Sequence, residues 1–107
     1  MSLDVTLRAE RIVEVYEDNI THNLGAMAEA AELYYPLWRP EEISITTAYQ
    51  LVPVLKAGLE RLKKDPEKFK ALNPSNGWGD YDGLVNFVEE YLDSCKDNPD
   101  AIIHVSR

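Results

Sequence analysis

Residues 73–81 read Asn-Pro-Ser-Asn-Gly-Trp-Gly-Asp-Tyr, and this stretch divides the second half of the chain into separate helical segments. It combines proline, glycine and asparagine, which favour turns, with a tryptophan held between two glycines. We therefore expect an ordered corner of the fold here, which forms one side of any small site that the protein has.

The segment after this corner is predicted to be a long helix. Asp80 is placed to cap its first turn, and the Asn-Pro-Asp sequence at 98–100 ends it. Between these limits the apolar residues recur at helical spacing. They are Leu84, Val88, Tyr91 and Cys95.

The segment just before the corner is predicted to be a short helix. Asp65 followed by Pro66 is an acidic cap with proline at the first helical position. This helix is expected to end near Leu72, with Phe69 and Leu72 as its buried anchors.

Two further helices are expected nearer the N-terminus. Thr47 and Gln50 resemble a capping box for a helix that reaches about Lys64. An earlier helix is expected to start at the Asp-Asn-Ile-Thr sequence of residues 18–21. It is expected to end near Tyr35, because the proline that follows disfavours helical backbone in its predecessor.

Strands are expected at the two ends of the chain. Apolar and polar residues alternate from Val5 to Val15, and we favour one long strand there, although a hairpin near Glu10 and Arg11 is the alternative. Residues 101–107 alternate in the same way and are expected to pair with the first strand. The predicted fold class is α+β: three main helices and one short helix packed on a small sheet formed by the N- and C-terminal strands, in a single domain spanning residues 1–107.

The composition excludes several classes of protein. A formal net charge of −8 argues against direct nucleic-acid binding, which needs clustered Lys and Arg. No apolar run approaches the roughly 18 residues that span a bilayer, and the N-terminus lacks a signal region, so no membrane association is expected. Cys95 is the single cysteine and forms no internal disulfide, which is typical of a reducing compartment. We expect a soluble, cytoplasmic protein.

The charge is unevenly distributed along the chain. Residues 80–100 are strongly acidic, whereas residues 56–70 are rich in lysine and arginine. The simplest interpretation is a pair of solvated helix faces. The alternative is an acidic interface, centred on Glu89, Glu90 and Asp93, that steers a basic protein partner or mimics nucleic acid.

Four short motifs stand out in the chain: Asn-Ile-Thr-His-Asn-Leu at 19–24, Leu-Trp-Arg-Pro at 37–40, the corner at 73–81, and Val-Ser-Arg at 105–107. With these motifs the chain resembles, from about residue 12 onward, a small family of uncharacterised proteins found in bacterial and bacteriophage genomes. The resemblance implies a phage or mobile-element context. Because that family has no established activity, it implies no catalytic residue.

The sequence carries no recognised catalytic or metal-binding motif. His22 and His104 stand without a Cys, Asp or Glu at a metal-ligand spacing, so no metal and no cofactor are expected. Cys95 lies on the apolar stripe of the last helix, where we interpret it as packing. A minimal enzyme with His22 as general base is the weakest hypothesis, since no partner carboxylate or nucleophile accompanies it.

Residues beside the predicted helix ends form the candidate binding surface, because such loops commonly carry recognition residues on a rigid scaffold. They are His22, Asn23, Arg39, Asn76, Trp78 and Tyr81. The competing interpretation, which we favour for the tryptophans, is that Trp38 and Trp78 fill the ends of a small core.

Two functions besides the minimal enzyme follow from these features. The leading hypothesis is a non-enzymatic protein that binds a host or phage protein through the acidic helix or the aromatic loops. The alternative is a small-ligand binder, in which Trp38, Trp78 and Arg39 line one cavity together with His22 and Asn76. A homodimer formed through a free sheet edge is left open.

Overall fold

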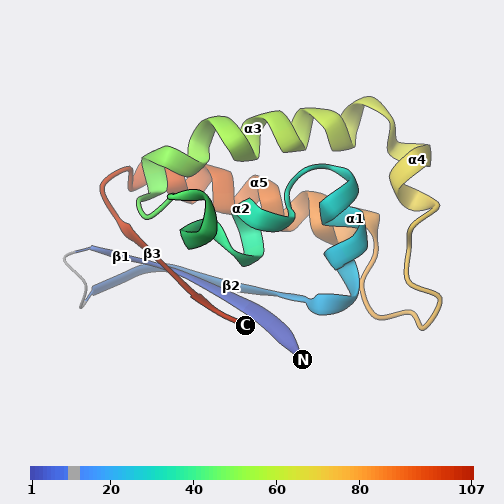
Figure 1. Cartoon of the computed structure of the whole chain (residues 1–107), viewed down its shortest axis with the longest axis horizontal. Helices are drawn as coiled ribbons and strands as arrows, with labels where there is room; N and C mark the ends of the chain where they lie inside the picture. The colour runs from blue at the N-terminus through green and yellow to red at the C-terminus, as the bar shows by residue number, and fades with distance from the viewer. Residues whose placement is uncertain (10–12) are drawn as a thin grey trace.

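The computed structural model describes residues 1–9 and 13–107 and shows an antiparallel sheet with helices packed on one of its faces (Figure 1). The α+β prediction is confirmed. In chain order the elements are β1 (Ser2–Ala9), β2 (Val13–Thr21), the 3-10 helix η1 (His22–Leu24), α1 (Gly25–Ala30), α2 (Tyr34–Trp38), the 3-10 helix η2 (Pro40–Ile43), α3 (Ala48–Lys64), α4 (Pro66–Lys70), α5 (Tyr81–Asp97) and β3 (Ile102–Ser106).

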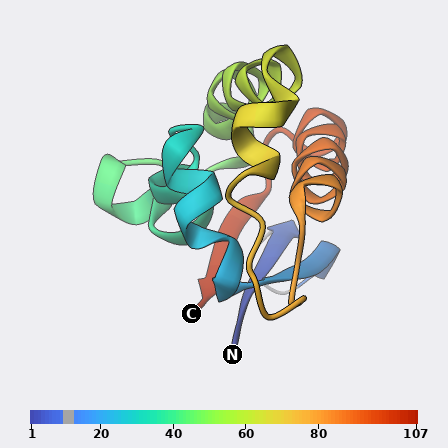
Figure 2. The same cartoon turned by 90° about the vertical axis from the view of Figure 1, so that its right-hand side faces the viewer.

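The sheet has three strands in the order β2-β1-β3, so the first strand lies in the middle. β1 pairs with β3 in antiparallel register, with Val5 opposite Val105, which confirms that the two ends of the chain pair with each other. The inward residues Leu3, Val5 and Leu7 of β1 are fully buried. They face the helices, of which α3 and α5 lie above the sheet in Figure 2 and α1 and α2 lie to its left.

The prediction of one long strand from Val5 to Val15 is wrong. Two antiparallel strands replace it, and their register places Leu3 opposite Ile20 and Leu7 opposite Tyr16. The hairpin considered as an alternative therefore gives the right strand arrangement, while its predicted turn at residues 10–11 lies outside the described residues. An alternating pattern continues unchanged through both strands of a hairpin, so it does not reveal where the chain reverses.

The single helix predicted from residue 21 to 35 is also wrong, because β2 continues through Thr21 and the helical region is divided. The left-handed backbone of Glu32, with φ of 60°, separates α1 from α2. Pro36 lies in the first turn of α2 instead of after its end. A proline is tolerated there, because the first amides of a helix have no intrahelical acceptor.

The helices with strong local start signals are confirmed. Thr47 and Gln50 form the predicted capping box of α3. The Asp80 carboxylate accepts a 2.7 Å hydrogen bond from the amide of Gly83 in the first turn of α5. The short helix α4 buries Phe69 as predicted, but Leu72 is exposed, because α4 ends before it.

α3 and α5 lie side by side above the sheet and supply much of the core (Figure 1). Their buried residues include Leu51, Leu55 and Leu62 of α3 and Leu84, Val88, Tyr91 and Cys95 of α5. Tyr91 also stacks on Tyr16 of β2, with ring centroids 5.8 Å apart, which fixes α5 against that strand.

Gly58 of α3 marks a close approach between α3 and the chain that leads into α2. A Cβ at this position would overlap the side chain of Leu33, which is fully buried. We predict that Gly58→Ala lowers the free energy of unfolding by about 1–3 kcal/mol, measured by urea denaturation.

The companion experiment uses Leu33→Ala, which removes the overlapping atoms. In that background Gly58→Ala is expected to cost much less than in the wild type. An equal cost in both backgrounds would contradict the close approach as the cause.

Candidate recognition site

The corner predicted from the sequence is a loop braced by its own polar side chains. We call residues 73–80 the Trp78 loop. Asn73 Oδ1 accepts a 2.8 Å bond from the amide of Tyr81, and Asn76 Oδ1 accepts a 3.0 Å bond from the amide of Trp78. Gly77 and Gly79 both have positive φ, which glycine adopts without strain. The loop is therefore held in a defined shape on both sides of the tryptophan.

The Trp78 loop rests on the chain that follows β2. The backbone of Gly79 lies so close to this segment that a Cβ there would come within 2.7 Å of Thr21 Cγ2 and 3.0 Å of Leu24 Cγ. Only glycine allows this approach. The contact brings the corner of the second half of the chain against the end of the first hairpin.

The two tryptophans have opposite environments. Trp38 is 2% exposed and stacks on Tyr34, so the core interpretation is confirmed for it. Trp78 is 69% exposed, so the core interpretation is wrong for it. Tyr81 takes the interior position instead: its ring is buried, and its hydroxyl donates a 2.6 Å bond to the carbonyl of Leu62.

His22 is held by a hydrogen bond from the core. Trp38 Nε1 donates to His22 Nδ1 at 2.7 Å. Because an indole N–H only donates, Nδ1 must be an acceptor, and the neutral ring carries its proton on Nε2. In this state His22 offers a donor, and its acceptor nitrogen is already engaged, which does not suit a general base.

Arg39 points to its own segment. Its Nη1 pairs with Glu42 at 2.7 Å, and its Nε lies 3.4 Å from the Tyr34 hydroxyl. The C-terminal Arg107 has a related role that sequence reasoning missed. It donates a 2.8 Å bond to the carbonyl of Trp38 and pairs with Glu41, which ties the end of the chain to the residue that holds His22.

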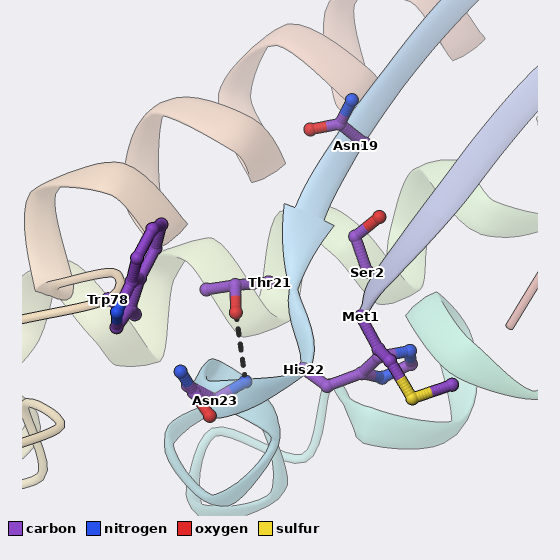
Figure 3. A pocket seen from close by; sticks show the side chains of 7 residues that line it. All are labelled: Met1, Ser2, Asn19, Thr21, His22, Asn23 and Trp78. Atoms are coloured by element: carbon purple, nitrogen blue, oxygen red, sulfur yellow. Dashed lines mark hydrogen bonds between the residues drawn. The ribbon is translucent and has the colours of Figure 1, made fainter. Parts of the chain in front are cut away.

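An open hollow of about 550 Å³ lies around the end of β2, with Trp78 on its rim (Figure 3). We call it the Trp78 hollow. It is lined by Met1, Ser2, Asn19, Thr21, His22, Asn23 and Trp78.

The Trp78 hollow unites only half of the predicted binding residues. His22, Asn23 and Trp78 line it, whereas Arg39, Asn76 and Tyr81 do not. The prediction that Trp38, Trp78 and Arg39 share one cavity is wrong. Met1, Ser2, Asn19 and Thr21 were missed as lining residues, because they reach this point only through the strand register, in which Ser2 lies opposite Thr21.

The three residues of the predicted acidic interface also differ in their surroundings. Glu89 pairs with Lys63 of α3 at 3.6 Å, Asp93 is exposed, and Glu90 is exposed on the side of α5 that faces β2. There Glu90 lines a second hollow of about 350 Å³, between β2 and the first half of α5, together with Asp18 and Asp80. We call this space the acidic hollow.

The two hollows differ in the chemical groups that they offer. The lining of the Trp78 hollow offers an aromatic face, amides, hydroxyls and an imidazole donor. Within residues 1–9 and 13–107, no group of three His, Cys, Asp or Glu side chains is placed to hold a metal ion. Cys95 is fully buried, and burial raises the pKa of its thiol to about 12, so it is a poor nucleophile at neutral pH.

Comparison with known proteins gives no matching family model, no match among curated proteins and no match among solved structures. The resemblance to phage and bacterial proteins therefore stays a prediction from the sequence. None of the helices in the described part of the chain is long and apolar enough to cross a membrane.

The bond between Trp38 and His22 predicts a specific tautomer. At pH 7.5 long-range ¹H–¹⁵N NMR spectra should show His22 as the neutral ring with its proton on Nε2. Trp38→Phe removes the only donor that the structure gives to Nδ1, and we expect its spectrum to show a mixture of tautomers. An Nδ1-protonated ring in the wild type would contradict the bond.

Proposed function

We propose that this chain is a non-enzymatic interaction protein that binds a protein partner through the exposed face of Trp78 and the adjoining Trp78 hollow. The observation that carries the proposal is the 69% exposure of Trp78 in a loop fixed by internal hydrogen bonds. Tryptophan is among the residues most enriched at the energetic centres of protein interfaces.

Burying the exposed ring of Trp78 would stabilise a complex through the apolar surface that is removed from water. Covering so exposed a ring removes on the order of 100–150 Å² of apolar surface, which is worth about 3 kcal/mol. The loop is already held in shape, so little conformational entropy is lost when the ring is covered. The amides of Asn19 and Asn23 and the Nε2–H of His22 add hydrogen-bonding groups to the lining of the same hollow.

The net charge of the chain and its family resemblance indicate the class of partner. A net charge of −8 disfavours nucleic acid and favours a protein with a basic surface. The family resemblance supports a host or phage protein in the cytoplasm, and the single buried thiol of Cys95 fits that reducing compartment.

Affinity capture from a bacterial lysate, with partners identified by mass spectrometry, tests this function. Trp78→Ala should lose at least one partner that the wild type captures, with an affinity loss of roughly tenfold or more. Tyr49→Ala is the matched control, because Tyr49 is also an exposed aromatic, 55% exposed, but lies on α3.

Two controls make the result decisive. Both variants should keep the circular dichroism spectrum and unfolding midpoint of the wild type, since neither residue is buried. A set of partners that is identical for the wild type, Trp78→Ala and Tyr49→Ala would contradict the proposal.

A further inference from the structure

Among the described residues, the sheet has one long open edge. β2 pairs only with β1, so no strand covers its other side, where the amide of Asn19 is bonded to the carboxylate of Asp18. The outer side of β3 is partly covered, because Ile103 donates a 2.9 Å bond to the carbonyl of Thr46 and residue 47 bridges to residue 102. An unpaired strand edge is a template for a further strand.

The two hollows lie at the end of this open edge. Asn19 and Thr21 of β2 border both of them, while Ser2 lines only the Trp78 hollow and Asp18 only the acidic hollow. Successive side chains of a strand point to opposite faces. A strand added to β2 would thus send alternate side chains toward α5 and the acidic hollow, and the others toward the face that carries Trp78.

The charges along this edge are of one sign. Glu14 and Glu17 are exposed side chains of β2, of which Glu14 pairs with Arg8 of β1 at 3.6 Å, and Asp18 lies at the edge itself, where it accepts a 2.8 Å bond from the amide of Asn19. The acidic hollow adds Asp80 and Glu90, and its lining contains no lysine or arginine. In Figure 2, α5 lies above β2, and Asp18 of β2 and Glu90 of α5 line the same hollow between the two elements.

We propose that the open edge of β2 binds an extended, basic segment of another protein as a fourth strand, with Lys or Arg at alternate positions facing the acidic hollow. This inference rests on the proposed function and deepens it, because it names the class of partner. Main-chain hydrogen bonds supply affinity in such complexes, and the alternate side chains supply specificity.

A second copy of this chain fits the edge less well. Antiparallel self-pairing would bring Glu14, Glu17 and Asp18 next to the same carboxylates of the other copy, and like charges on neighbouring strands are destabilising. Acidic residues on an edge strand also oppose pairing between identical edges. The homodimer considered from the sequence is thus the less favoured occupant of this edge.

The test uses the full chain, labelled with ¹⁵N, and a synthetic eight-residue peptide of alternating lysine and valine. We expect the peptide to shift the amide signals of residues 14–20 and to slow their hydrogen exchange. The control peptide replaces every lysine by glutamate and should bind at least tenfold more weakly. Raising the salt concentration should weaken binding of the lysine peptide, because the charges are exposed.

Paired charge reversals locate the site. The double variant Asp18→Lys, Glu90→Lys reverses two charges that line the acidic hollow, and should weaken binding of the lysine peptide by roughly tenfold. The double variant Glu60→Lys, Glu67→Lys makes the same change in net charge at exposed positions on α3 and α4, and should bind like the wild type.

Three results would overturn the inference. The first is equal affinity for both peptides, and the second is that the NMR signals of the β2 amides do not shift at millimolar peptide. The third is a dimer in sedimentation whose β2 amides are protected from hydrogen exchange without peptide. The outcome is separable from that of the proposed function. If Trp78→Ala loses a captured partner but no peptide binds at β2, the result contradicts only the proposal that β2 binds a fourth strand. If the peptide binds at β2 but Trp78→Ala captures the same partners as the wild type, the result contradicts only the proposed role of Trp78.

Discussion

The pairing of β1 with both of its neighbours is the constraint on which the rest of the structure depends. β1 lies between β2 and β3, so a single strand joins the N-terminal hairpin to the C-terminal end of the chain. Its inward residues Leu3, Val5 and Leu7 are fully buried under the helices. Because Asp4 to Arg8 of β1 have partners on both sides, the register of this segment fixes the positions of both neighbouring strands at once.

This register also brings together the residues of the candidate site. Pairing of Ser2 with Thr21 brings the start of the chain to the end of β2, where η1 begins and places His22. Arg107, which follows β3, donates a hydrogen bond to the carbonyl of Trp38, and the indole N–H of Trp38 donates one to His22. The Trp78 loop then closes the site through the contact of Gly79 with Thr21. Segments from five parts of the chain therefore meet at one end of the sheet.

The sequence predicted the features that short-range chemistry controls. The capping box at Thr47 and Gln50 and the cap at Asp80 identify the starts of α3 and α5, because a cap and its amides lie within one turn. The same logic failed at Pro36, where a proline inside a first turn has the same local appearance as a proline after a helix end.

The candidate site was less predictable, because its geometry depends on contacts distant in sequence. The motifs drew attention to His22, Asn23 and Trp78, and these do meet at one hollow. Nothing local indicated that Trp78 is exposed while Tyr81, three residues later, is buried against Leu62. Ser2 and Asn19 join the site only through strand register, which the alternating pattern of the hairpin left open.

The central claim is that one tryptophan is structural and the other is available for binding. The exchange of the two indole N–H protons with water, followed by NMR, tests it most directly. The account predicts a slowly exchanging indole for Trp38, whose proton is buried and bonded to His22, and an indole for Trp78 that exchanges nearly as fast as in an unfolded peptide. Two slowly exchanging indoles would contradict the account, because Trp78 would then be covered and could not form the recognition surface.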